Sequence, residues 1–251
     1  VSIATNDSFA AIACERGGMA GEDVFVVRSA PRTDTFVIAP PDETLKQGFR
    51  YLIGYVGVIG QQEGMDLLVA AADHLVNRLG RRDVHFAIVG FGPHLPVVEA
   101  DVAARGLGAH FTFTGPQYGE ALLAWLNAAD ICVSPDPKTA MNDISTMNKV
   151  IEYMTLKKPV VQFDLHEGRA SAGDAALYAR SNDPHDFADK IVTLLDDPER
   201  RAAMGEIGRA RVEQGLSWAH SAPRLLAAYD RVFEKRARQG RGPGKGKPAS
   251  D

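Results

Sequence analysis

The sequence has little cysteine and no long apolar run, and both absences narrow the class of protein. Its 251 residues include two cysteines, Cys14 and Cys132, which lie far apart without the spacing of metal ligands. This pattern argues against a disulfide framework or a zinc site, and we expect two reduced thiols in a cytoplasmic protein. No apolar run approaches the ~18 residues of a membrane-spanning helix, so the sequence predicts no membrane span.

An excess of positive charge is also missing from most of the chain. The formal net charge of the chain is −4. The segment from Lys235 onward contains six basic residues and one acidic residue, Asp251, so the remaining chain has a more negative net charge than the whole. An acidic body is a poor general binder of nucleic acid. The segment 239–251 is rich in Gly, Pro and basic residues, and we expect a disordered tail. Weak contact with an anionic membrane surface is the alternative.

The composition that is present is that of an ordinary globular protein. Hydrophobic residues make up 45% of the chain and charged residues 24%, which allows a sizeable core. The chain begins with Val1 rather than Met, and we expect a fragment or a processed chain.

From residue 51 onward, apolar strand patterns alternate with helix patterns. Repeated βα units indicate a parallel sheet with helices on both faces, a Rossmann-like α/β fold. Gly168 and Gly173 predict a loop in the second half of the chain. The expected strands are 24–28, 51–56, 84–89, 110–113, 130–134, 159–163 and 176–179. The expected helices are 6–17, 64–79, 95–105, 118–128, one from about 145, 184–195, 198–213 and 218–236.

The segment 134–161 carries the candidate site. It continues from a buried strand through a polar loop into a helix, for which Ser145 or Thr146 would be the N-cap. At about 100° per residue, Ser145, Lys149 and Glu152 share the polar face of this helix, beginning at its positive end. Such a stripe can bind a phosphate through Lys149 and backbone N–H groups, with Glu152 accepting from paired hydroxyls. The alternative is the solvated face of an amphipathic helix.

Two glycine loops follow the first two strands of the repeated units. Gly57 and Gly60 stand between a strand and a helix, where backbone amides can approach a diphosphate. Gly90 and Gly92 form a Gly-x-Gly-Pro turn, which either contacts the ligand or only needs the backbone freedom of glycine. No compact Gly-x-Gly-x-x-Gly follows the first of these strands, which argues against a dinucleotide cofactor.

The helix of segment 134–161 and its following strand resemble the donor-nucleotide motif of retaining glycosyltransferases with the GT-B fold. That motif has two glutamates eight positions apart before a small-residue turn and Pro-Val-Val. Glu152 matches the second glutamate, whereas position 144, where the first would stand, is Ile. A bacterial variant ends in Asn-Lys-x-x-Glu-Tyr-Met, and the residues that fit it are Asn148, Lys149, Glu152, Tyr153 and Met154.

The resemblance implies that a nucleoside diphosphate sugar is the donor and that no further cofactor and no metal is needed. Glu152 would hold the ribose, and Lys149 with the amides near Ser145 and Gly60 would stabilise the diphosphate leaving group. Thr146 and Asn148 would lie at the same helix start and contact the donor.

The resemblance also has gaps. Gln61 and Glu63 stand where the family usually has Arg and Lys for the diphosphate. Asp143 would replace the missing first glutamate at the donor sugar, although a loop Asp is more often a turn or capping residue.

The resemblance further implies one half of a GT-B double domain. Residues 1–48 would be the end of an acceptor-binding domain and a linker, residues 49–216 the nucleotide-sugar-binding domain, and residues 217–238 a crossing helix. Because most of the acceptor domain would be absent, we expect no sugar transfer by this chain alone.

Two other functions remain open from the sequence. A sugar-nucleotide epimerase of the same fold would need paired acid/base groups, and the histidines at positions 85, 94, 110 and 166 are scattered. A non-catalytic Rossmann-like binding module is the second alternative.

Overall fold

The computed structural model describes residues 1–240, without the side chains of residues 239 and 240. The chain forms two compact units, one of residues 30–218 and one that combines residues 1–29 with the chain from residue 219 onward. The part of the predicted tail from residue 241 to 251 lies outside the described residues.

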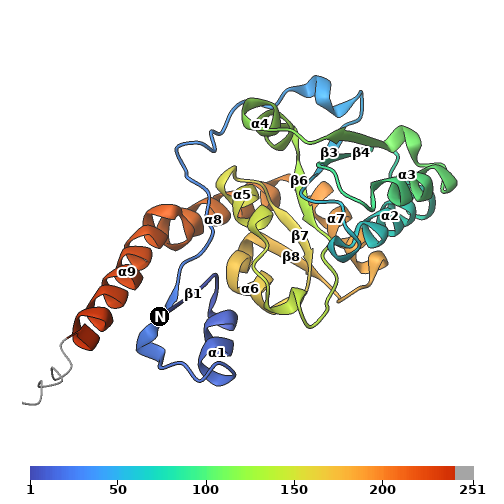
Figure 1. Ribbon diagram of the computed structural model, residues 1–251. Helices are drawn as coiled ribbons and strands as arrows, with labels where there is room; N and C mark the ends of the chain where they lie inside the picture. Colours follow the sequence, from blue (N-terminus) through green and yellow to red (C-terminus); the bar gives the residue numbers. More distant parts are fainter. Residues whose placement is uncertain (241–251) are drawn as a thin grey trace, which may run out of the picture. The chain divides into compact units, whose positions relative to one another are not determined.

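A six-stranded parallel sheet is the centre of the larger unit (Figure 1). The order is β5-β4-β3-β6-β7-β8, so the chain starts in the middle, builds toward one edge and then returns to build toward the other. This confirms the predicted Rossmann-like α/β fold. The strands are β3 (Tyr51–Val56), β4 (Val84–Val89), β5 (Phe111–Gly115), β6 (Ile131–Ser134), β7 (Val160–Phe163) and β8 (Ala176–Ala179).

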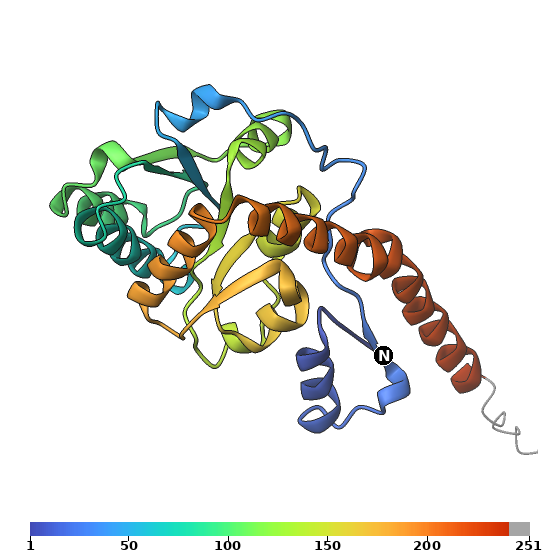
Figure 2. The same cartoon turned by 180° about the vertical axis from the view of Figure 1, so that it is seen from behind.

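Helices cover both faces of this sheet, as Figures 1 and 2 show. Ile53 and Tyr55 of β3 point into a core with α2, α3 and α7, whereas Leu52 points to the opposite face and packs with α4. This alternation follows from the two-residue period of a strand. The helices are α2 (Met65–Asp73, extended by a π-helical turn His74–Arg78), α3 (Leu95–Ala104), α4 (Gly119–Ala128), α5 (Asn148–Thr155), α6 (His166–Ala172), α7 (Pro184–Leu195) and α8 (Pro198–Arg211, extended by a π-helical turn Val212–Leu216).

The smaller unit contains a short parallel pair and two helices. Strands β1 (Ser2–Ala4) and β2 (Val24–Val26) pair in parallel, and α1 (Asp7–Glu15) lies between them in sequence. Asn6 caps α1 by accepting a hydrogen bond from the Phe9 amide at 2.8 Å. Asp23 accepts hydrogen bonds from Lys235 and Arg231 of α9 (Trp218–Gly240), and these two bonds lower the pKa of the Asp23 carboxyl to about 2.

Several boundary predictions were wrong, including the following four. The strand expected at 24–28 ends at Val26 and is only half-buried. The loop expected around Gly168 is helix α6, and Gly168 stands there against the Gln162 amide, where a Cβ would be crowded. Residues 239 and 240 belong to α9 rather than to a tail, since Ala237 and Arg238 before them favour a helix. The fourth error is the start of α5, which bears on the site.

No helix among residues 1–240 combines the length and apolarity needed to cross a bilayer.

Candidate active site

The site lies where the sheet order reverses, at the carboxyl ends of β3 and β6. The ladder between these strands ends at Gly54 and Cys132. Beyond it, the Tyr153 hydroxyl accepts from the Val56 amide at 2.9 Å and donates to the Val133 carbonyl at 3.3 Å. Tyr153 of α5 therefore ties the two diverging strand ends together. Open parallel sheets bind their ligands in the crevice at such a point.

Lys149, in the first turn of α5, extends its ammonium group into this region. Nζ lies 2.8 Å from both carboxylate oxygens of Asp136, in the loop that follows β6. The Asp136 carboxylate is 3% exposed and the Lys149 side chain 11%, so the ion pair is largely withdrawn from water. Ser134 donates a further hydrogen bond to Asp136.

Lys149 also contacts the end of β3. Its ammonium lies over the Tyr55 ring, 5.4 Å from the centroid, a cation–π contact. A Cβ added to Gly57 would lie 3.4 Å from Lys149 Cε and 2.9 Å from the Tyr55 hydroxyl. Gly57 has φ +154°, so this position needs glycine for its backbone, and a Cβ there would also crowd the Tyr55 hydroxyl.

Glu152 lies three residues after Lys149 on the same side of α5 and is half-buried. Burial raises the pKa of its carboxyl, and the charge of Lys149 opposes this rise. No hydrogen-bond partner for this carboxylate is found among the described side chains. Lys149 and Glu152 are thus not the fully solvated face of a helix, the alternative that the sequence left open.

Ser145 does not belong to this stripe, contrary to the prediction. Helix α5 begins at Asn148, and Met147 is its N-cap without a side-chain hydrogen bond. Ser145 instead ends a short 3-10 turn (Asn142–Ile144): its amide donates to the Asn142 carbonyl at 3.1 Å and its hydroxyl to the Met141 carbonyl at 2.7 Å. The helix starts later because this turn already engages the Ser145 backbone. Thr146 precedes the helix, and Asn148 is its exposed first residue.

The two glycine loops pack backbone against backbone. The Gly57 amide donates to the Val89 carbonyl at 3.1 Å, and the Gly90 amide donates to the Gly115 carbonyl at 3.0 Å. A Cβ at Gly90 would clash with the Gly57 carbonyl, and one at Gly92 would clash with the Ile59 carbonyl. Both Gly57 and Gly90 amides are therefore occupied, and close packing explains these glycines.

Gly60 lies in the same first loop, beside Glu63. A Cβ at Gly60 would clash with Glu63 Oε2, which is buried and has no hydrogen-bond partner within the described part of the chain. Glu63 thus places negative charge where the family motif usually has a lysine.

Asp143 is engaged in the local structure. Its Oδ1 accepts from the His166 amide at 2.8 Å, at the start of α6, and lies 3.5 Å from Lys138 Nζ. This is the capping role that is common for a loop Asp.

Sequence reasoning missed Asp136. Its position in the loop after a buried strand, beside Ser134, was the available signal, but its thirteen-residue separation from Lys149 hid the pairing. Among residues 1–240, no three His, Cys, Asp or Glu side chains are grouped so that they could hold a metal ion.

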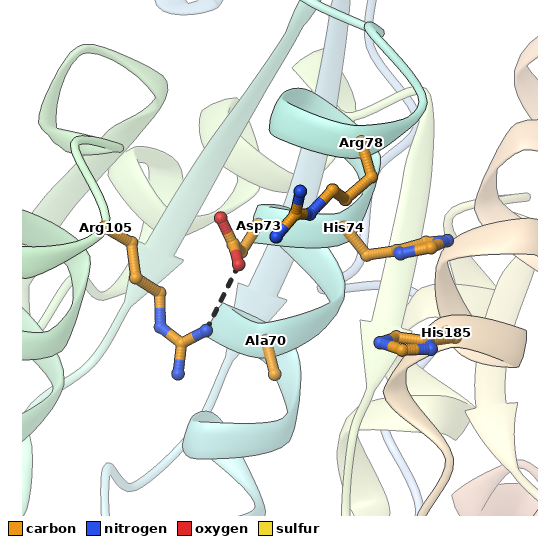
Figure 3. Close-up of a pocket in the computed structure, with 6 residues that line it drawn as sticks. All are labelled: Ala70, Asp73, His74, Arg78, Arg105 and His185. Atoms are coloured by element: carbon orange, nitrogen blue, oxygen red, sulfur yellow. Dashed lines mark hydrogen bonds and ion pairs between the residues drawn. The ribbon is translucent and has the colours of Figure 1, made fainter.

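A surface hollow of about 420 Å³ lies elsewhere, between α2, α3 and α7 (Figure 3). Figure 3 shows the stacked rings of His74 and His185, with centroids 4.2 Å apart, and the ion pair of Arg105 with Asp73. None of the predicted site residues lines this hollow.

Comparisons with known proteins place the fold and the family. The 2-deoxystreptamine glucosyltransferase of Streptomyces kanamyceticus is 29% identical over 227 residues, which cover 87% of this chain and 57% of that protein. The Anabaena protein HepE in complex with UDP-glucose superposes with a TM-score of 0.74 at 15% identity, covering 92% of this chain and 63% of that one. The C-terminal domain of a group 1 glycosyl transferase from Francisella tularensis superposes with a TM-score of 0.61 at 20% identity, covering 75% of this chain and 99% of that one.

The chain spans about half the length of the curated relatives that it matches. Residues 50–197, which are more than half of the chain and contain all six strands of the larger sheet, match the family described as "Glycosyl transferases group 1". The chain belongs to the group 1 glycosyl transferases.

Proposed function

We propose that this chain binds a nucleoside diphosphate sugar and is the donor-binding half of a retaining glycosyltransferase with the GT-B fold. The observation that carries the proposal is the position of the Lys149 ammonium, between the loops that follow β3 and β6. A cation at the reversal point of a parallel sheet suits the phosphates of a nucleotide. The binding of UDP-glucose by the structural neighbour HepE supports a nucleotide sugar as the donor.

Lys149 would meet the diphosphate. Two of its three N–H groups are directed at Asp136, which leaves one for a phosphate oxygen. Glu152 would accept hydrogen bonds from the ribose hydroxyls, because its carboxylate lies on the same side of α5 without a partner of its own among the described residues. Thr146 and Asn148, at the start of α5, would complete the donor contacts.

The chemistry required is stabilisation of a leaving group. As the bond from the anomeric carbon to the diphosphate breaks, negative charge develops on the phosphate oxygen, and a fixed cation beside it lowers the barrier. Retention at the anomeric carbon is inferred from the resemblance of the motif around Glu152.

We infer that a further domain, outside this chain, binds the acceptor. The nearly complete match to a solved C-terminal domain of the same family supports this arrangement. Inactivity of the chain alone and a cytoplasmic location remain predictions.

Calorimetry with uridine or guanosine diphosphate, the nucleoside and pyrophosphate tests the proposal. Lys149→Gln keeps a hydrogen-bond donor for Asp136 but removes the charge, and should cost about 1.5 to 3 kcal/mol of diphosphate affinity, less at high salt. Glu152→Gln should weaken nucleoside binding and leave pyrophosphate binding nearly intact. Lys157→Gln is the matched control, because Lys157 lies beyond the end of α5, is partly exposed and pairs with Glu206.

Two results would contradict the proposal. One is equal binding of all three ligands by the parent chain and both site variants. The other is thermal stabilisation by nicotinamide dinucleotides but not by nucleoside diphosphates, which would favour a dinucleotide-binding module.

A further inference from the structure

Asp136 is the most deeply buried ionised group at the site. Both of its oxygens contact the Lys149 ammonium at 2.8 Å, and Ser134 donates to one of them. The Asp136 carboxylate is only 3% exposed, so little water solvates its negative charge. The contacts with Lys149 and Ser134 replace that solvation. The positive charge of Lys149 is therefore already balanced by Asp136 before any ligand binds.

Within residues 1–240, Lys149 is the one cation paired with Asp136. Burial, then the charge of Asp136 and then that of Glu63, raise the pKa of Tyr55, over whose ring the Lys149 ammonium lies. The Asp136 carboxylate contacts the Lys149 ammonium directly, and the charge of Lys149 also acts on the Glu152 carboxyl. A diphosphate entering this site meets a weaker attraction than Lys149 alone would exert.

We propose that Asp136 is the internal counter-ion of Lys149, and that it competes with the diphosphate for the ammonium and so promotes release of the nucleoside diphosphate product. This inference rests on the proposed function. In the empty site Asp136 holds Lys149 beside Gly57, and in the occupied site the ammonium is shared between Asp136 and a phosphate oxygen.

The charge balance of the reaction makes this competition selective. When the bond between the anomeric carbon and the phosphate oxygen breaks, the electron pair stays on that oxygen. The sugar goes to the oxygen of an acceptor hydroxyl, whose proton passes to solvent water, and the nucleoside diphosphate then carries about one more negative charge than the donor did. A fixed carboxylate therefore weakens product binding more than donor binding.

Asp136→Asn tests this directly, because asparagine keeps an acceptor for Lys149 and removes the charge. The affinities of the full chain for UDP, UDP-glucose, pyrophosphate and uridine are measured by calorimetry at low salt and at high salt. UDP and pyrophosphate should bind about tenfold tighter to the variant at low salt. UDP-glucose should gain less, uridine should be unchanged, and the gain should shrink at high salt.

Asp164→Asn is the matched control. Asp164 follows β7 at the same edge of the sheet, but it pairs with Arg169 and not with Lys149. Its replacement changes the net charge by the same amount and should leave all four affinities unchanged. Thermal unfolding of each variant confirms folding, and Asp136→Ser, which is smaller, repeats the test if asparagine does not fit.

The outcomes separate the two proposals. If the parent chain binds none of the nucleotides or pyrophosphate, the proposed function fails, and the role of Asp136 fails with it. If the parent binds UDP and Lys149→Gln weakens that binding, but Asp136→Asn and Asp136→Ser do not strengthen it, the counter-ion role alone is wrong. Equal gains from Asp136→Asn and Asp164→Asn would also overturn it, since net charge would then explain both.

Discussion

At the scale of single residues, the burial of Glu152 would suit the proposed role of its carboxylate in binding paired hydroxyls. A carboxylate in water is already hydrogen-bonded, whereas a half-buried one without a partner among the described residues gains more from paired hydroxyls. The same burial has a consequence for stability, because it raises the pKa of Glu152 in the folded chain.

The pH dependence of stability follows from that rise. Below the unfolded pKa, near 4.5, Glu152 is protonated in both states and contributes nothing. As the pH rises through the folded pKa, the folded state must ionise a buried group, and stability is lost. Glu152→Gln should therefore match the parent near pH 4 and become more stable than the parent toward pH 7, as thermal unfolding in the absence of ligand would measure.

Glu99→Gln, on the exposed surface of α3, is the control for this comparison and should show no such divergence. A difference in stability between Glu152→Gln and the parent that stays constant from pH 4 to pH 8 would contradict a raised pKa of Glu152 in the folded chain.

At the scale of elements, α6 depends on a residue from another segment. Asp143 accepts from the His166 amide and so satisfies one of the free N–H groups at the start of this seven-residue helix. The sequence analysis predicted that the same carboxylate contacts the donor sugar. Variants of Asp143 can separate this role from the capping of α6.

Asp143→Ala should lower the free energy of unfolding by about 1 kcal/mol through loss of the cap. Asp143→Asn keeps the accepting oxygen and should stay close to the parent. Chemical denaturation measures both. A role at the donor sugar would appear as weaker binding of UDP-glucose, relative to UDP, in Asp143→Asn despite its normal stability. Equal stability of the alanine variant and the parent would show that the cap contributes little.

At the scale of the whole molecule, the hydrophobic core belongs to one of the two units. All three clusters of buried apolar side chains among the described residues lie between Phe36 and Leu216. The unit of residues 30–218 therefore contains what a cooperative fold needs.

A shortened chain of residues 30–218 should unfold in one cooperative transition and bind UDP with the affinity of the full chain, as calorimetry would measure. A chain cut at residue 195 is the control, because it loses Met204 and Val212 from the clusters and should lose cooperative unfolding. Failure of the 30–218 chain to fold would mean that its stability depends on the remaining residues.

The sequence by itself determined the elements whose patterns are local. Strands 51–56 and 84–89 and helix 184–195 have the predicted bounds, since apolar alternation, helical periodicity and a proline at the helix start are read from neighbouring residues. The three-residue spacing of Lys149 and Glu152 likewise places both on one side of α5.

Only the tertiary structure decided what these side chains meet. Irregular loops bring together residues that lie apart in the sequence. They pair Asp136 with Lys149, place Ser145 at the end of a 3-10 turn and let Asp143 cap α6. Loop backbones have no period from which such pairings can be read. The fold was therefore predictable from the sequence, whereas the charge balance of the site required the packed chain.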